Sequence, residues 1–237
     1  MAIFDAFVFW FRRQGIFWIL SLAIAGLAAA IAYLIEARRE LGEWRGHWAL
    51  SALFAMIYAL FLDRWIKEAL LDGADFCEET DNLRRSVISL RFVLFAALLI
   101  ALAFAVAEIP VMGAGPAIWV ILATPLALLL PSFSAGEPLS PVEALRLGAP
   151  VFFTLLVAIG VATALFVLAP HVAEWVQPQL PRRSWAPAAL AAATTLIDML
   201  LLAIVGHVLA ALYRARSGWQ QPEPVERPYR AMRWRKA

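Results

Sequence analysis

Six runs of mostly apolar residues constrain the fold of this chain more than any other feature. They cover residues 16–35, 46–62, 87–109, 116–130, 151–169 and 186–212. A helix needs about 20 mostly apolar residues to cross the roughly 30 Å of hydrocarbon in a bilayer. With 63% hydrophobic residues, the chain also has more apolar surface than one soluble core can hide. The sequence therefore predicts an all-α, polytopic transmembrane helical bundle with about six spans.

The apolar runs divide the chain into three predicted regions. In residues 1–15 the apolar stretch before Arg12 and Arg13 is too short to cross a bilayer, so we expect an interfacial N-terminal helix. Residues 16–213 make up the six-span transmembrane domain. Residues 214–237 are rich in bases, proline and glutamine, which predicts a basic, flexible cytoplasmic tail.

The second apolar run is followed by apolar residues at helical spacing. These residues are Leu62, Trp65, Ile66, Ala69 and Leu70. The spacing predicts that the second helix continues as an amphipathic extension along the cytoplasmic surface, with Gly73 ending it.

Two further features predict local structure between the fourth and fifth runs. Pro125 lies inside the fourth run and lacks a backbone donor, which predicts a kink or interruption of that helix. Ser140, Pro141 and Glu143 have the spacing of a capping box with proline at the first helical position. They predict a short interfacial helix at about residues 141–147.

The distribution of positive charge predicts the orientation. If the N-terminus is inside, most bases lie on the cytoplasmic side, and the arginines left outside are Arg38, Arg39, Arg45, Arg182 and Arg183. This excess favours an N-in, C-in arrangement. The single cysteine, Cys77, excludes an internal disulfide and any multi-cysteine metal site, which is typical of a cytoplasm-facing chain.

Asp198 is the most informative candidate site residue. It lies near the middle of the sixth apolar run, where an ionised acid is costly unless it is paired or faces water. Thr194 and Thr195 precede it by about one helical turn and share its face. The three residues predict either a proton or cation transport site or a hydrogen-bonded group that joins helices inside the bundle.

A second polar layer is predicted closer to the cytoplasm. Asp63 ends the second run, Arg91 begins the third, and His207 lies late in the sixth at a comparable depth. We expect Asp63 to pair with Arg91, whose side chain extends toward the interface. A lone intramembrane histidine such as His207 could also ligate haem or chlorophyll through its neutral imidazole.

The basic tail is a candidate binding segment. Its bases are Arg227, Arg230, Arg233, Arg235 and Lys236, and they alternate with aromatic residues. That mixture could stack on single-stranded nucleic acid. Beside a membrane, anionic lipid headgroups are the expected partner, and a neighbouring subunit is the alternative.

The stretch from Leu130 and Pro131 through residues 138–148, with the sequence PLSPVEALRLG, resembles part of poorly characterised bacterial multi-spanning families related to the membrane domain of glycerophosphodiester phosphodiesterases. In those families a span that ends in proline is followed by an Ala-Leu-Arg helix at the cytoplasmic face. The serine and the Thr-Arg-Gly that often follow are absent here. The resemblance implies a bacterial inner-membrane bundle and no activity, because the chain has no catalytic domain.

Together these features predict a non-catalytic inner-membrane scaffold or accessory subunit of a larger complex, or a homo-oligomer. Gly26 with Ala30, and Gly160 with Ala164, have the small-residue spacing that allows close helix approach. The alternatives are a small transporter or channel with Asp198 at its midplane, and a haem- or chlorophyll-binding subunit through His207. In the first two cases we expect no cofactor and no metal, since no zinc, nucleophile or phosphate-loop motif is present.

Overall fold

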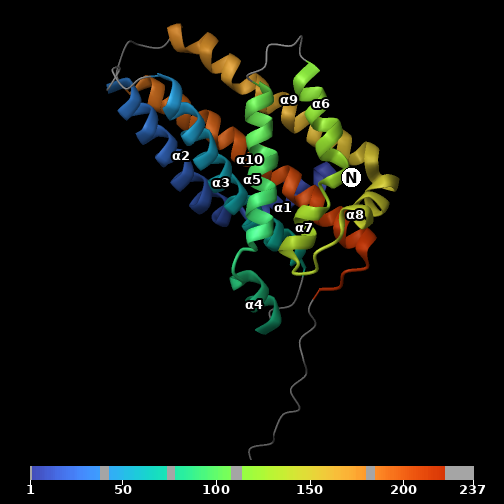
Figure 1. The fold of residues 1–237 in the computed structure, drawn as a ribbon. Helices are drawn as coiled ribbons and strands as arrows, with labels where there is room; N and C mark the ends of the chain where they lie inside the picture. The colour runs from blue at the N-terminus through green and yellow to red at the C-terminus, as the bar shows by residue number, and fades with distance from the viewer. Residues whose placement is uncertain (1, 38–42, 74–77, 108–113, 180–184, 222–237) are drawn as a thin grey trace, which may run out of the picture.

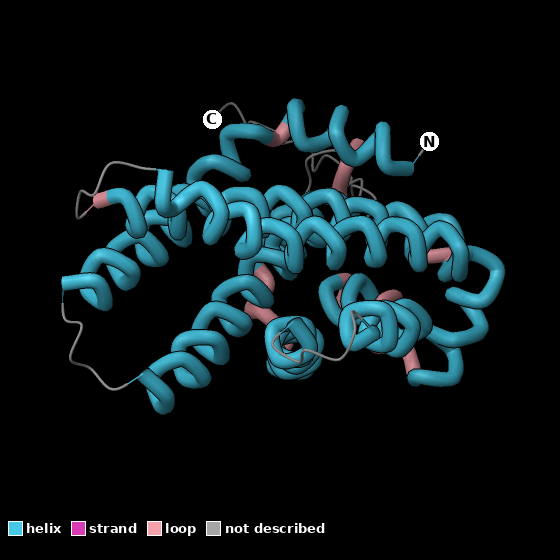
Figure 2. Tube along the Cα trace, turned by 90° about the horizontal axis from the view of Figure 1, so that it is seen from above, coloured by secondary structure: helices cyan, strands magenta, loops and turns pink. Residues whose placement is uncertain are grey.

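The computed structural model describes residues 2–37, 43–73, 78–107, 114–179 and 185–221, and throughout these ranges its regular elements are helices (Figure 1, Figure 2). In chain order the elements are α1 (Ala2–Arg12), α2 (Gln14–Ala37), α3 (Glu43–Leu70), α4 (Glu78–Arg85), α5 (Leu90–Ala107), α6 (Ala114–Ala123), η1 (Thr124–Leu126), α7 (Leu129–Ser134), α8 (Pro141–Gly148), η2 (Ala149–Val151), α9 (Phe152–Val176), η3 (Gln177–Gln179) and α10 (Ala186–Ser217). The predicted all-α class is confirmed for the described residues.

Three helical stretches are long and apolar enough to cross a membrane. They are Gln14–Leu34, Pro141–Ala173 and Ala186–Ser217. Two shorter apolar stretches, Leu90–Leu102 and Gly115–Leu126, accompany them. Helices of this length and hydropathy are compatible with a membrane protein. The number of six spans and the orientation of the termini stay predictions.

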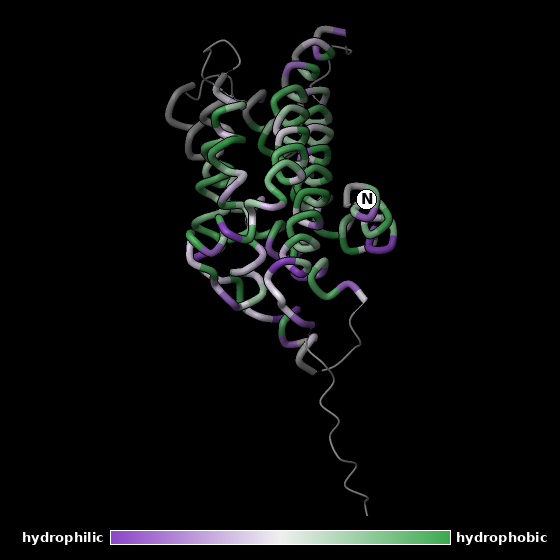
Figure 3. Tube along the Cα trace, turned by 90° about the vertical axis from the view of Figure 1, so that its right-hand side faces the viewer, coloured by the Kyte–Doolittle hydropathy of each residue, from purple (hydrophilic) through white to green (hydrophobic). Residues whose placement is uncertain are grey.

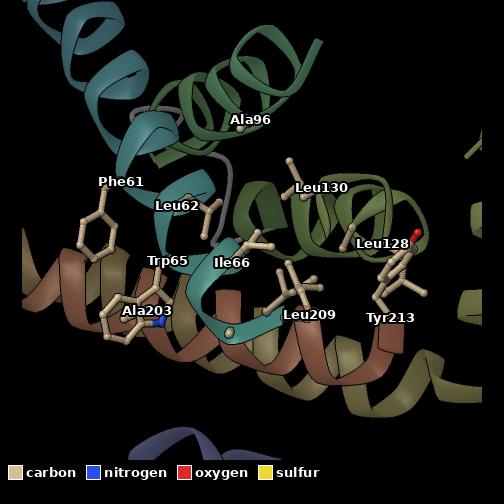
Figure 4. Close-up of a cluster of buried hydrophobic side chains, with 14 of the residues drawn as sticks. Phe61, Leu62, Trp65, Ile66, Ala96, Leu128, Leu130, Ala203, Leu209 and Tyr213 are labelled. Atoms are coloured by element: carbon tan, nitrogen blue, oxygen red, sulfur yellow. The ribbon is translucent and has the colours of Figure 1, made fainter. Parts of the chain in front are cut away.

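Helix α10 is the element around which the others are arranged, because it packs against α1, α2, α3 and α9. It approaches α3 closely at Gly206. A Cβ atom on Gly206 would lie 3.0 Å from Leu62 Cδ1, 3.3 Å from Trp65 Cδ1 and 3.4 Å from Ile66 Cγ1. Figure 4 shows these three α3 side chains lying over α10, within a buried apolar cluster. Glycine therefore sets the distance between the two helices.

Helix α1 is separate from α2, as the sequence predicts for the N-terminal segment. Figure 3 shows α1 nearly end-on while the long helices run up the picture, so its axis crosses theirs. Ala6 and Phe9 are buried beneath it, whereas Phe4 and Phe11 are 71% and 63% exposed. The helix thus has one face on the bundle and an apolar face turned outward.

The predicted break at Pro125 and the predicted capping box are both present, whereas the interfacial position of the helix that follows stays a prediction. The run breaks after α6 into the 3-10 turn η1, which contains Pro125, and then continues as α7. Helix α8 begins with the predicted capping box, in which the Glu143 amide donates to Ser140 Oγ (3.3 Å) and the Ser140 amide donates to Glu143 Oε2 (2.8 Å). Pro141 occupies the first turn, where its missing N–H is not needed.

The predicted extension of the second helix is partly wrong. Helix α3 does continue to Leu70, and Gly73 follows in the left-handed conformation at φ +80°. However, its polar side does not lie on a surface, because Asp63, Lys67 and Glu68 are each 3% exposed or less. Helices α4, α5 and α7 pack against α3 and enclose the polar face that an amphipathic surface helix would present to water.

Gly206→Val should destabilise the protein more than Gly26→Val. The added methyl groups would overlap with Leu62 and Trp65, at a cost of about 1–3 kcal/mol from overpacking. Gly26→Val is the matched control, because no atom lies within 4 Å of the Gly26 Cβ position. Both substitutions replace a helical glycine with valine, so they change the helix propensity equally. Unfolding by a denaturing detergent, followed by tryptophan emission, measures the difference. Equal effects of the two substitutions would show that α3 and α10 are not in close contact at Gly206.

Candidate functional site

Asp198 lies on α10, about 18 Å along the helix axis from its first residue. Its partner is Tyr58 on α3, whose hydroxyl donates a hydrogen bond to Asp198 Oδ2 over 3.1 Å. The two residues are 140 positions apart in the chain, and the close packing of α3 on α10 brings them together. Tyr58 itself is buried, at 3% exposure.

A cavity of about 100 Å³ opens beside this pair. Helices α3, α5, α6, α9 and α10 all contribute to its wall, and its lining is almost wholly apolar. The lining residues are Tyr58, Ile100, Trp119, Ile159, Ala162, Thr163, Phe166, Asp198, Leu201, Leu202 and Val205. Asp198 is thus the acidic residue of an otherwise apolar, partly aromatic wall.

Two polar groups in the wall are held in place by backbone carbonyls. The Trp119 indole N–H on α6 donates to the Leu99 carbonyl of α5 over 3.0 Å. The Thr163 hydroxyl on α9 donates to the Ile159 carbonyl one turn earlier over 2.7 Å. Both donors are used, so the indole presents its ring to the cavity and the Thr163 oxygen can act there only as an acceptor.

The charge of an ionised Asp198 has no ion-pair partner in the part of the chain that the structure describes. Among the described residues no lysine or arginine forms an ion pair with it, and the Tyr58 hydroxyl is the donor on its carboxylate. An acid in a helical bundle normally pairs with a base or a backbone group. Asp198 can therefore take up a proton or hold a positively charged group that enters the cavity.

The predicted patch of Asp198, Thr194 and Thr195 is only partly assembled. Thr195 is buried and lies within hydrogen-bonding reach of the Tyr58 hydroxyl. Thr194 instead donates to the carbonyls of Leu190 and Ala191 on its own helix, at 3.1 Å each. Neither threonine lines the cavity, so the site consists of Asp198 and Tyr58 with Thr195 behind them.

The predicted layer of Asp63, Arg91 and His207 does not form. Arg91 has an exposed side chain at the start of α5. Asp63 is paired with Lys67, with Nζ and Oδ2 at 2.8 Å, since one helical turn along α3 places the lysine on the same face. His207 packs its ring on Phe9 of α1, with the centroids 4.7 Å apart.

The packing around His207 gives no support to a pigment or haem site. The ring is 5% exposed and Phe9 covers it, and its Nδ1 atom is buried without a hydrogen-bond partner. His207 is not among the residues that line the cavity. In the described ranges, no three His, Cys, Asp or Glu side chains are grouped so that they could hold a metal ion.

A buried ionic network lies at the end of α3, and we call it the α3 charge cluster. It consists of Asp63, Arg64, Lys67 and Glu68 of α3 with Arg84 of α4 and Ser134 of α7. The Ser134 hydroxyl donates to Asp63 Oδ1 over 2.7 Å, and Lys67 Nζ donates to the Ser86 carbonyl over 3.2 Å. These contacts tie α7 and the segment before α5 to α3.

Glu68 is the centre of the second half of the α3 charge cluster. Its Oε1 atom lies 3.1 Å from Arg64 Nη2, and its Oε2 atom lies 3.6 Å from Arg84 Nε. Arg64 also donates to the Arg84 carbonyl. Every charge in the cluster has a neighbour of opposite sign, so it is a structural element that joins helices, in contrast to the uncompensated Asp198.

Several of these residues were missed in the sequence. Tyr58 lies inside the second apolar run, about one helical turn before its end, and a buried tyrosine hydroxyl generally needs a partner. That signal could have paired it with Asp198. Lys67 and Glu68 follow Asp63 and Arg64 by one turn each, which is a visible pattern of ion pairs. Trp119 and Thr163 carry no such signal.

The five basic tail residues from Arg227 to Lys236 lie outside the described residues. Their predicted binding to lipid headgroups or to a partner subunit stays a prediction. Ser217 and Gln221, which are described, hold the beginning of the segment after α10 through hydrogen bonds to Tyr213 and Leu70 carbonyls.

Lys67→Met should destabilise the protein by about 3–5 kcal/mol, because it leaves the Asp63 carboxylate buried without its cation. The double variant Asp63→Asn/Lys67→Met should recover most of that loss, since the amide oxygen can still accept from Ser134. Arg146→Met, an exposed base on α8, is the control and should change stability by less than about 0.5 kcal/mol. Unfolding in mixed detergent measures all three. A double variant as unstable as Lys67→Met alone would contradict the pairing.

Comparison of the chain with protein-family models, with curated proteins and with solved structures finds no match. The resemblance of residues 130–148 to bacterial multi-spanning families therefore stays a prediction. In the structure this stretch forms α7, the segment leading to the capping box, and α8.

Proposed function

We propose that this chain is an integral membrane protein that binds a small solute at Asp198 and Tyr58 and carries it across the bilayer. The observation that supports this most is the carboxylate of Asp198, which lies at an apolar cavity inside the bundle without a compensating base among the described residues. A carboxylate that served only to hold helices together would not require a cavity beside it. The cavity thus favours the transport alternative over the purely structural one.

The proposed arrangement has six passes with both termini in the cytoplasm of a bacterial cell. The passes are α2, α3, α5, α6 with α7, α9 and α10, in agreement with the six apolar runs. Figure 3 supports a common polar end, because hydrophilic residues gather at the lower end of the bundle, where Figure 1 places α4. The excess of positive charge assigns that end to the cytoplasm.

The broken fourth pass supports a transport role. Helix α6 ends at Ala123, η1 follows with Pro125, and both pack against α9. Trp119 of α6 and Thr163 of α9 line the cavity, so the helix that is interrupted contributes to the wall about one turn before its break. Discontinuous helices beside a midplane site recur in transporters, because they can change shape without losing the rest of the bundle.

Proteoliposomes test the proposal. A pyranine assay would report protons, and a panel of radiolabelled small cations, neutral molecules and anions would report solute uptake. We expect uptake of at least one of these above protein-free liposomes. Ala162→Phe, which fills the cavity, and Asp198→Asn, which removes the charge, should each reduce it about tenfold or more.

Ala164→Phe is the matched control, because Ala164 is exposed on the same helix, two positions from Ala162. It should leave uptake unchanged. Absence of uptake of every solute, or uptake that survives Ala162→Phe, would contradict a solute pathway through this cavity.

An accessory subunit of a membrane complex is the second candidate function, and one observation favours it. Gly26 and Ala30 of α2 face outward, and no atom lies within 4 Å of the Cβ position of Gly26. This small-residue face is therefore unused inside the bundle and can receive a helix of a neighbouring subunit or of a second copy. The basic tail would add contacts to anionic lipid headgroups or to that partner.

Gly26→Leu tests the second candidate, because a bulky side chain would keep an approaching helix away. Particle size after mild extraction from native membranes is the measurement. If α2 holds a partner, the native protein should run as a larger particle of defined composition, and the variant should run as the single chain. A native protein that runs alone would remove the accessory-subunit candidate and leave the solute site unaffected.

A further inference from the structure

We infer that the solute bound beside Asp198 is a small organic cation of the alkylammonium class. The inference rests on the proposed function and names the ligand chemistry of the same site. Three properties of the cavity carry it: an acid without an ion-pair partner among the described residues, a wall with few oxygen atoms, and three aromatic side chains in the lining.

The sign of the ligand follows from the charges around the cavity. Asp198 is the acid of the wall, and neither lysine nor arginine is among the lining residues. The Tyr58 hydroxyl already donates to Asp198, so it offers no hydrogen to an anion. A negatively charged solute would face a carboxylate with no donor to hold it, whereas a cation would compensate Asp198.

The small number of oxygen atoms argues against an inorganic cation. The wall offers the Asp198 carboxylate and the hydroxyl oxygens of Tyr58 and Thr163. A calcium ion takes six to eight oxygen ligands and magnesium about six, and a hydrated ion that entered would have to exchange water ligands for contacts with aliphatic carbon. A quaternary alkylammonium group needs no such coordination, because it carries no N–H donor and its surface is methyl or methylene.

The aromatic residues suit the same ligand. Tyr58, Trp119 and Phe166 come from three different helices and line the cavity together with Asp198. The hydrogen bond from the Trp119 indole to the Leu99 carbonyl fixes the orientation of the largest ring. Cations bind to the faces of such rings, and tryptophan gives the strongest attraction.

The size of the cavity limits the ligand. An engineered apolar cavity of about 150 Å³ holds benzene. The cavity of about 100 Å³ here is smaller, so it suits a headgroup of roughly the size of tetramethylammonium. Drug-sized ligands occupy pockets several times larger.

Equilibrium dialysis with radiolabelled tetramethylammonium and the full-length protein in detergent tests the inference. We expect saturable binding with one ligand per chain, and tert-butanol, an uncharged molecule of similar shape, should compete poorly. Asp198→Asn should weaken binding about tenfold or more, while its amide oxygen still accepts the hydrogen bond from Tyr58 and preserves the packing. Asp5→Asn, at an exposed acid on α1, is the matched control and should bind as the native protein does.

Substitutions of Trp119 separate the aromatic contribution from the charge. Trp119→Leu should weaken binding about 3- to 30-fold, and Trp119→Phe, which keeps a ring, should weaken it less. The inference would be overturned if Asp198→Asn bound tetramethylammonium as tightly as the native protein does. It would also be overturned if tert-butanol displaced tetramethylammonium as well as unlabelled tetramethylammonium does.

The binding experiment and the proteoliposome experiment fail separately. If tetramethylammonium does not bind but uptake of a neutral or anionic solute depends on Ala162 and Asp198, the ligand class is wrong and the solute site stands. If tetramethylammonium binds as described but no solute is taken up, the ligand class stands and the transport function is wrong. If there is neither binding nor uptake, both proposals are wrong.

Discussion

The close packing of α10 on α3 at Gly206 is the contact on which the rest of the structure depends. With no side chain at this position, Leu62, Trp65 and Ile66 of α3 lie directly on α10. The same approach, further along both helices, allows the Tyr58 hydroxyl to reach Asp198. Trp65 also makes an edge contact with Phe9 of α1, with the ring centroids 5.4 Å apart, and so connects α1 to this contact. One glycine therefore positions both the candidate site and the N-terminal helix.

The sequence predicts those parts of the fold that depend on neighbours along the chain. The capping box of Ser140 and Glu143, the break at Pro125 and the separation of residues 1–15 from the first long helix each follow from a local pattern, and each is present. The place of Asp198 well inside a long helix could also be predicted, because it lies in the middle of a long apolar run, whereas its depth in a membrane stays a prediction. Local hydrogen bonding and hydropathy are sufficient for these features.

What the sequence could not provide is the rotation of each helix about its axis. Asp198 and Tyr58 are 140 positions apart, and Asp63 and Ser134 are 71 apart, so their pairing depends on which faces the helices turn toward one another. The similar predicted depths of Asp63 and Arg91 suggested that these two residues pair. The structure instead pairs Asp63 with Lys67, which lies one turn further along the same helix. The cavity arises from side chains of five helices, so no short segment encodes it.

The interruption after Ala123 also bears on how the chain is made. Helix α6 has ten residues, so it extends about 15 Å, or half the hydrocarbon thickness, and it gains little by entering lipid alone. Its contacts are with α5, which is synthesised before it, and with α9, which is synthesised after it. An isolated α6 would therefore be a poor membrane-spanning segment, and its full set of contacts exists only once α9 has been synthesised as well.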